Sequence, residues 1–553
     1  MNIPNPAIVT QRAAQPLPRL ALWLFCAAYL IPGLIGREPW KNADIAAFGY
    51  MVKLSQGNAS WLAPLVGGLP AEGGSLVPYW IGAAFIKALG WAVGPAMAAR
   101  LPFALLLGLV LALTWYTTYH LARTEAARPV AFAFGGEANT IDYARAMADG
   151  ALLALIATLG LLQLGHETTP ELVQLFGAAL WLYALASAPY RKWQPRIAMV
   201  ASLVLVSTSG APSIAVALSL IGAALSWRSS YEEVRKLSLW ALGGGLLAAL
   251  VATALGAWGW RVIGVTSGAQ AGSLLRLLAW FTWPAWPLAI WTLWRWRGHL
   301  AHRHISVPLS AAVLAVLTCC FMGASDRALM LGLPGMAVLS AFALPTMQRR
   351  AASAIDWFSV FFFTFCALTI WVVYGSLMTG LPAKPAANVM RLAPGFQPTF
   401  SVFALIAAVL ATVAWLWLVK WRTGRNRHPL WKSLVLPATG VALCWLLLMT
   451  LWLPMLDYAR SYAPLMERTR AIVPTGSCLS ANGVPRAHPA ALEYYGRYQV
   501  DAVTPLSETP CKYLLVLENR VRPAAPPSAS WKLLGTAQRP TDRDEVSAFY
   551  ERR

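Results

Sequence analysis

Apolar runs of roughly 20 residues alternate with short polar segments along most of the chain, and each run is long enough to cross a lipid bilayer as a helix. Hydropathy predicts about 13 spans, some of them shorter than the usual length of about 20 residues. They are residues 20–36, 101–120, 149–165, 172–189, 197–209, 212–226, 238–258, 277–296, 307–322, 328–347, 357–379, 399–419 and 432–455. The pattern therefore predicts a polytopic α-helical membrane protein with its transmembrane module in residues 1–456.

Three longer polar segments interrupt or follow the spans. Residues 37–100 form an aromatic-rich, partly amphipathic loop after the first span, and residues 121–148 form a second loop. The tail, residues 457–553, contains a short strand-like run, "CKYLLVLENR", and a helix-like run, "HPAALEYYGRY", between turns rich in Pro and Gly. This alternation predicts a small mixed α/β domain at the C-terminus.

Composition agrees with a membrane protein. The chain is 58% hydrophobic and 12% charged, whereas soluble proteins carry about 25% charged residues. The formal charge of +21 does not indicate nucleic-acid binding, because the Lys and Arg residues lie in short loops between the spans. They gather in the alternate loops 191–196, 227–236, 295–304, 348–350 and 420–432.

Loop charge predicts the orientation of the chain. Basic loops stay in the cytoplasm, so the N-terminus and residues 121–148 are expected inside. Residues 37–100 are expected outside, and the odd number of spans places the tail outside as well. The first apolar run lacks a small-residue cleavage site, so we interpret it as an uncleaved span.

Two of the seven cysteines lie in the polar tail, and the other five lie in apolar runs. An external tail would be in an oxidising compartment, where disulfides persist. We therefore expect Cys478 and Cys511 to pair.

The loop after the first span holds a candidate site. "NADIAAFGYMVKL" places Ile45, Phe48, Met51 and Val52 on one side of a helix, which fits a helix lying along a membrane surface. Asp44 falls in its first turn, where a carboxylate suits the helix dipole. On this pattern alone, Asp44 is either a helix-start acid or a functional carboxylate.

Several blocks of this loop resemble the first outer loop of GT-C membrane glycosyltransferases, in particular the aminoarabinose transferase and protein O-mannosyltransferase type (glycosyltransferase families 39 and 83). Asp44 matches the first acid of the family's Asp-Glu pair. "ASWLAP" (59–64) matches its Trp-Leu-Val-Pro block, and "GLPAEGGSLVPYW" (68–80) matches the run from Gly-Leu-Pro to Tyr-Trp. Two family residues differ here: Ile45 replaces the second acid, and Gly73 replaces the Lys that follows the Glu matched by Glu72.

The resemblance implies a GT-C-like fold with a periplasmic C-terminal α/β domain, in the inner membrane of a bacterial cell. It also implies an inverting transfer of a sugar from a polyprenyl-phosphate donor to a lipid, glycan or protein acceptor of the envelope. Asp44 would serve the acceptor as base or orienting carboxylate. The missing Lys leaves Arg37, Lys41 or Arg327 to hold the donor phosphate, because guanidinium forks suit phosphate; Arg37 and Lys41 would otherwise only reach lipid headgroups.

A second acid is expected from one of two places. Asp149, in "MADGALLALIA", resembles the family motif but falls on the predicted cytoplasmic side. "GHETTPE" (165–171) falls on the outer side, so we favour Glu167 and Glu171 as catalytic carboxylates. His166 with Glu72 forms a weak candidate site for a divalent metal ion, and "TTPE" is equally typical of a plain helix start.

Two other functions remain open from the sequence. A non-catalytic relative would bind lipid-linked sugars or organise envelope assembly, and Ile45 and the missing Lys favour it. A transporter would carry charges near the middle of its spans, and the predicted spans hold almost none.

Overall fold

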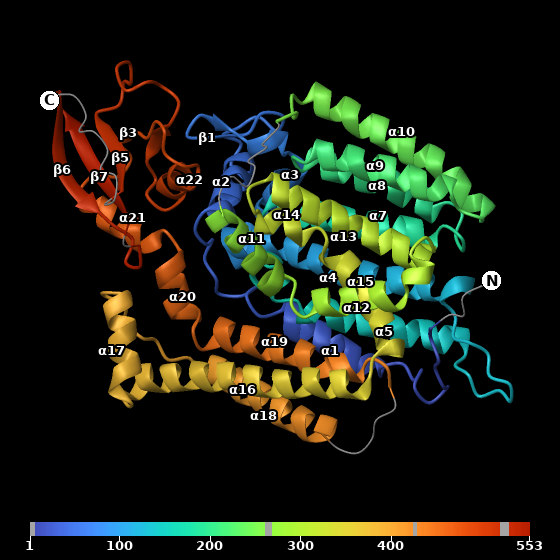
Figure 1. Ribbon diagram of the computed structural model, residues 1–553. Coiled ribbons are helices and arrows are strands. Elements are labelled where there is room, and N and C mark those ends of the chain that lie inside the picture. Colours follow the sequence, from blue (N-terminus) through green and yellow to red (C-terminus); the bar gives the residue numbers. More distant parts are fainter. Residues whose placement is uncertain (1–5, 260–267, 424–428, 520–529, 543) are drawn as a thin grey trace.

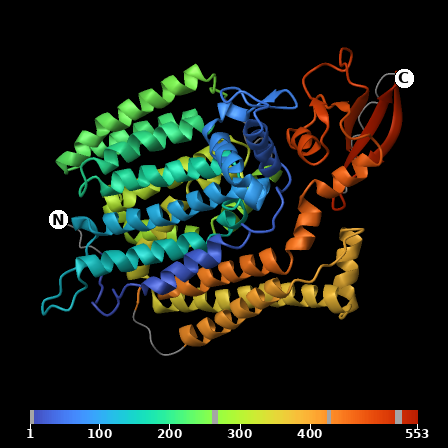
Figure 2. The same ribbon diagram turned by 180° about the vertical axis from the view of Figure 1, so that it is seen from behind.

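The computed structural model describes residues 6–259, 268–423, 429–519, 530–542 and 544–553. A bundle of roughly parallel helices joins, at one end, a small domain built around a β-sheet (Figure 1). The N-terminus lies at the far end of the bundle from this domain, and the view from behind shows the same arrangement (Figure 2).

The longer helices run along the bundle. They are α1 (Arg19–Leu30), α3 (Val77–Val93), α4 (Pro95–Ala122), α5 (Thr140–Ala157), α7 (Pro170–Ser187), α8 (Gln194–Thr208), α9 (Pro212–Trp227), α10 (Glu232–Ala254), α11 (Gly268–Phe281), α12 (Ala285–Arg295), α13 (Arg303–Phe321), α15 (Leu333–Ala343), α16 (Arg349–Thr379), α18 (Val402–Thr423) and α19 (Lys432–Thr450). Shorter helices connect them: α6 (Leu159–Leu164), α14 (Asp326–Met330) and α17 (Ala383–Leu392).

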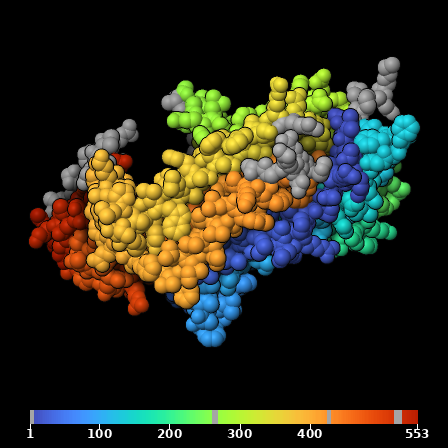
Figure 3. All heavy atoms as spheres, turned by 90° about the horizontal axis from the view of Figure 1, so that it is seen from below, coloured from blue at the N-terminus to red at the C-terminus, as the bar shows by residue number. Residues whose placement is uncertain are grey.

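Six helices in the described part of the chain are long and apolar enough to cross a membrane: α4, α10, α13, α16, α18 and α19. Five further apolar helices are shorter than a full span. The yellow and orange helices α16, α18 and α19 form one face of the molecule, beside blue α1 (Figure 3). Helices α16 and α18 expose large apolar side chains, among them Trp357, Phe361, Phe365, Phe403 and Trp417, as expected of a surface that contacts lipid. The chain is a polytopic helical membrane protein; the exact number of spans stays a prediction.

Two boundaries differ from the sequence-based expectation. Residues 121–148 were expected as one loop, but α5 begins at Thr140, where the side chain of Asn139 accepts a hydrogen bond from the backbone of Ile141. The interhelical segment is therefore shorter than predicted. The loop 37–100 likewise contains a 17-residue helix, α3, which packs against α4.

The helix expected on the membrane surface is α2 (Ala43–Ser55), and it is buried instead. It packs against α3 on one side and against α22 (Ala487–Tyr494) of the tail on another. The contact with α22 is close at Gly49, where a Cβ atom would lie 2.7 Å from the Cβ of Ala490. Apolar spacing predicted the helix correctly but could not reveal that the tail covers its outer side. The two short strands β1 (Leu65–Val66) and β2 (Leu69–Pro70) follow it.

The tail begins with α20 (Leu453–Arg460) and α21 (Ala463–Arg470). Its sheet has the strand order β4-β3-β5-β7-β6, with β3 parallel to β4 and β5, and β7 antiparallel to β5 and β6. The strands are β3 (Cys478–Ser480), β4 (Gln499–Asp501), β5 (Tyr513–Asn519), β6 (Trp531–Ala537) and β7 (Glu545–Arg552). The expected strand and helix are β5 and α22. A disulfide between Cys478 and Cys511 joins β3 to the segment before β5.

Candidate active site

Asp44 lies in the first turn of α2 with only 1% of its surface exposed, and hydrogen-bond donors surround its carboxylate. Oδ1 accepts from the backbone N–H and the hydroxyl of Thr168, each at 2.8 Å. Oδ2 accepts from the backbone N–H of Trp40 at 3.0 Å and lies 3.5 Å from Nη2 of Arg37. One carboxylate thus joins α2, the segment before it and the 165–169 turn.

Two buried guanidinium groups give this carboxylate its charge environment. Arg37 donates from Nη2 to the carbonyl of His166 at 2.5 Å, and its carbon Cζ lies 4.7 Å from the centre of the Trp40 ring. Arg100, from α4, donates from Nη1 to the carbonyl of Leu34 at 3.5 Å. Burial alone would raise the pKa of Asp44, but Arg37, Arg100 and the two backbone N–H donors together hold that pKa below its ordinary value. Asp44 is therefore ionised at neutral pH.

A second group of charges is centred on Arg327, which lies in α14. Its Nη2 lies 2.5 Å from Oε2 of Glu167, and its Nη1 lies 3.1 Å from the hydroxyl of Thr169 and 3.3 Å from Oε2 of Glu171. Glu167 is nearly buried, whereas the side chains of Arg327 and Glu171 are 22% and 26% exposed. Arg327 and Glu171 are therefore the members of this group that an external ligand can reach.

A chain of polar contacts extends the Arg327 group to the tail. Gln163 donates to Oε1 of Glu167 at 2.8 Å and accepts from Nη1 of Arg460 at 2.5 Å. Arg460, in α20, also lies over the Trp40 ring, with Cζ 4.9 Å from its centre. Trp40 in turn donates from its indole N–H to Asp457 at 2.7 Å. Acidic and basic residues from several segments distant in the sequence therefore meet where the bundle joins the tail.

Most of the residues singled out from the sequence belong to these two groups. Asp44, Arg37, Glu167, Glu171 and Arg327 lie in them, joined through the consecutive residues 166–169. Lys41 does not: its side chain is exposed, and the charges acting on it include Arg539 and Asp542 of the tail. Arg100 and Arg460 were missed, because each lies at the end of an apolar run where an arginine ordinarily anchors a helix.

The two places considered for a second acid lie apart. The 165–171 segment contacts Asp44 directly. Asp149 is buried near the start of α1, where it accepts from the backbone N–H of Leu17 at 2.7 Å and from the indole of Trp115 at 2.8 Å. This geometry supports Glu167 and Glu171 over Asp149 as partners of Asp44.

The residues suggested for a metal ion have other partners. Glu72 pairs with Arg486 of the tail at 2.7 Å. Both ring nitrogens of His166 lie within hydrogen-bond distance of backbone carbonyls, 2.7 Å from that of Leu162 and 2.9 Å from that of Tyr29. Among the described residues, no group of three or more His, Cys, Asp or Glu side chains is placed to hold a metal. Within the described residues, Glu72 and His166 are therefore not part of a cluster that could hold a metal ion.

Comparison with known proteins gives matches in structure but none in sequence. No family model and no curated protein matches the chain. Two crystal structures of ArnT from Cupriavidus metallidurans match along 96% of this chain and 98% of theirs, at 13% identity. The apo structure matches with a TM-score of 0.62 and the structure bound to undecaprenyl phosphate with 0.59. The chain therefore has the ArnT-like GT-C fold that the sequence resemblance implied.

Proposed function

We propose that this protein is an inverting glycosyltransferase that moves a sugar from a polyprenyl-phosphate donor to an acceptor of the cell envelope. The observation that carries the proposal is the fold, which is shared along 96% of the chain with an ArnT crystallised with undecaprenyl phosphate. About 13 spans, a cytoplasmic N-terminus, a periplasmic tail and a location in the bacterial inner membrane belong to the same proposal. The acceptor is a lipid, a glycan or a protein.

Arg327 is the cation best placed to hold the donor phosphate. It is partly exposed, whereas Arg37 and Arg100 are buried beside Asp44. Its fork is already oriented by Glu167, Thr169 and Glu171, and a planar guanidinium binds phosphate oxygens in pairs. A departing polyprenyl phosphate would carry negative charge, which the guanidinium of Arg327 would stabilise.

Glu171 is the carboxylate best placed to act as the base. Both oxygens of Asp44 are engaged by donors, so Asp44 supports the site by positioning Thr168 and Arg37. Glu171 uses one oxygen toward Arg327 and is partly exposed. In the proposed step, Glu171 accepts the proton of the acceptor, the acceptor atom bonds to the anomeric carbon, and the bond from that carbon to phosphate breaks on the opposite face. The anomeric centre is thereby inverted, and polyprenyl phosphate leaves with the electron pair.

A non-catalytic role is the second candidate, and one observation favours it. At the position of the family Lys, Gly73 adopts a positive φ of 61°, and a Cβ there would lie 3.1 Å from the carbonyl oxygen of Gly210. The next residue, Gly74, is packed even more closely, because its Cβ would lie 2.6 Å from the Cβ of Ala257. The close packing at Gly73 and Gly74 therefore leaves little room for a side chain at the position where the family carries its phosphate-binding Lys.

Binding and transfer measured on one membrane preparation separate the two candidates. The probes are a radiolabelled polyprenyl-phosphate sugar for transfer and polyprenyl phosphate for binding. We expect Glu171→Gln to bind like the wild type but to transfer about 10²–10⁴-fold more slowly, the usual range for loss of a general base. Glu508→Gln, which removes an exposed carboxylate of the tail, is the control. If the wild type binds the lipid but does not transfer sugar, the non-catalytic role is supported. If it shows no binding and no transfer, both candidate functions are wrong.

A further inference from the structure

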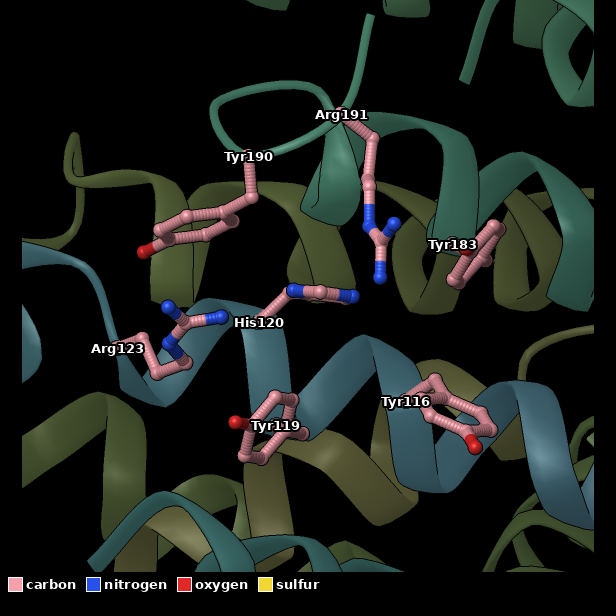
Figure 4. Close-up of a pocket in the computed structure, with 7 residues that line it drawn as sticks. All are labelled: Tyr116, Tyr119, His120, Arg123, Tyr183, Tyr190 and Arg191. Carbon is pink, nitrogen blue, oxygen red and sulfur yellow. The ribbon is translucent and has the colours of Figure 1, made fainter. Parts of the chain in front are cut away.

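A polar cavity lies where α4 ends and the chain turns from α7 into α8, at the end of the bundle away from the β-sheet domain (Figure 1). Figure 4 shows the residues that line it. Its volume is about 400 Å³, a size typical of small-ligand sites. Seven residues line it: Tyr116, Tyr119, His120, Arg123, Tyr183, Tyr190 and Arg191. The lining therefore combines two guanidinium groups, one imidazole and four phenols, and none of these seven described residues is a carboxylic acid.

The side chains of this cavity are held in place by one another. Cζ of Arg123 lies 4.4 Å from the centre of the Tyr190 ring and 5.2 Å from that of Tyr119. His120 stacks against the same Tyr190 ring at 5.3 Å. Figure 4 shows Arg123 and Arg191 approaching His120 from different sides. The positive charges of Arg123 and Arg191 both act on His120, and an anion between them would relieve the repulsion of like charges.

One hydrogen-bonding atom of the cavity lining is buried without a partner among the described residues. His120 is 6% exposed, and its buried Nδ1 has no hydrogen-bond partner among the described residues. A third arginine, Arg303, lies close enough to act electrostatically on Tyr190, and its Nε and Nη1 are likewise buried without a partner in that part of the chain. Buried polar atoms are seldom left unpaired, so the unpartnered Nδ1 of His120 favours a polar ligand in the cavity. Arg303 does not line the cavity but adds a further positive charge near Tyr190.

We propose that this cavity binds a phosphate group, carried by an anionic lipid headgroup or by a soluble phosphate ester. The hydrogen-bond donors around the cavity come from α4, α7 and the start of the next loop. One guanidinium fork can already pair with both oxygens of a carboxylate, whereas a phosphate group can accept hydrogen bonds from several directions at once. The surroundings of the cavity also resemble a membrane interface, where Trp and basic residues gather. The cavity is beside the exposed Trp193 and the basic 191–196 segment, at the end of the bundle where the N-terminus lies. This site does not depend on the proposed glycosyltransferase activity.

The test uses the purified full-length protein in detergent and measures thermal unfolding against probe concentration, because a ligand of the folded state raises the unfolding temperature saturably. The probes are dioctanoyl phosphatidylglycerol, glycerol 3-phosphate and, as the phosphate-free counterpart, dioctanoylglycerol. We expect a saturable rise with phosphatidylglycerol and none with dioctanoylglycerol. A rise with glycerol 3-phosphate as well would identify soluble phosphate esters as ligands; its absence would identify the lipid headgroup.

Three variants show whether the cavity is responsible. Arg191→Gln removes an exposed guanidinium of the cavity lining, and Arg123→Lys keeps the charge but loses the fork. Each should weaken the apparent affinity about tenfold or more, the equivalent of one charge-assisted hydrogen bond. Lys192→Gln, the exposed neighbour, should change it by less than about twofold, because Lys192 does not line the cavity and could contribute only a screened, longer-range charge. No saturable rise with either phosphate probe, or equal weakening by Lys192→Gln and Arg191→Gln, would overturn the proposal.

Discussion

Arg327 and Glu167 form an ion pair with 2.5 Å between Nη2 and Oε2, although 160 positions separate them in the sequence. The pair fastens α14 to the turn before α7, and the same turn donates to Asp44. Glu167 has little exposure, so burial raises its pKa even though Arg327 lowers it. The ionised state of Glu167 therefore depends on Arg327.

We expect Arg327→Gln to destabilise the protein because it leaves the nearly buried Glu167 without its cation. Breaking a buried pair from one side typically costs about 3–5 kcal/mol. The double variant Arg327→Gln with Glu167→Gln should recover much of that loss, since no unpaired charge remains. The measurement is the unfolding temperature of each purified variant. Equal temperatures for the single and double variants would show that the unpaired charge of Glu167 is not the cause of the loss.

Asp44→Asn should impair both folding stability and sugar transfer. An amide has only one acceptor oxygen, so its NH₂ group would face either the donors of Thr168 or the N–H of Trp40. It would also leave Arg37 without a counter-charge. We expect transfer to fall by more than about 10²-fold, as for a misplaced site.

A pH–rate profile distinguishes positioning by Asp44 from proton transfer. If Asp44 only positions its neighbours, the residual activity of Asp44→Asn keeps the pH dependence of the wild type. A changed profile would instead identify Asp44 as a group that titrates during the reaction, and the role given to Glu171 would be wrong.

Sequence reasoning reached the fold and the residues of the candidate site by different routes. Apolar runs report on burial in lipid or protein, so the helices were predictable. Asp44 was found from a string of motif blocks, and the 165–171 segment from loop charge. Neither signal depends on knowing the three-dimensional packing.

The missed features all depend on contacts between distant segments. Arg100 and Arg460 join the site only because α4, α20 and the loop after α1 converge. The surface helix predicted from Ile45, Phe48 and Met51 is covered by α22, more than 400 positions away. The sequence also could not show that both carboxylate oxygens of Asp44 accept hydrogen bonds. Because of these bonds, we propose Glu171 rather than Asp44 as the base.

Stability should depend on pH through Asp457, which lies in α20 outside the spanning helices. Burial raises the pKa of Asp457 from 3.8 to about 6, although Trp40 donates to it. Since the pKa is raised in the folded state, its contribution to stability is complete below pH 3.8 and is lost as the pH rises through about 6. Asp457→Asn resembles the neutral acid and should flatten this part of the profile. Unfolding temperatures measured from pH 4 to 7 would test this; parallel curves for the two proteins would contradict it.

Thiol labelling should find two blocked cysteines. Of the seven cysteines in the chain, Cys478 and Cys511 are bonded and the other five are free. Denatured, non-reduced protein should therefore label at five thiols, and reduced protein at all seven. Cys320→Ser is the control, since it should lower both numbers by one. Labelling of all seven thiols without reduction would show that the pair does not form.

Removing this disulfide should loosen the tail. Loss of a native disulfide from a small domain typically costs about 2–5 kcal/mol. We expect Cys478→Ser to make residues 457–553 more sensitive to limited proteolysis, whereas Cys320→Ser should leave their digestion unchanged. Identical digestion of the two variants would indicate that the sheet and its contact with α2 suffice.

The side of the membrane on which the tail lies also decides the side of the candidate site. The indole of Trp40 donates a hydrogen bond to Asp457, and Lys53 of α2 forms an ion pair with Glu493 of α22 at 3.1 Å. The tail and the candidate site therefore lie at the same end of the bundle. Basic loops gather at the other end, which predicts an external tail. A phosphatase fused after Arg553 should be active in cells, and a reporter that works only in the cytoplasm should be silent there. A fusion within the 227–236 loop should give the reverse pattern. If the tail fusion behaved as cytoplasmic, the site would face the cytoplasm, and an acceptor in the envelope could not reach it.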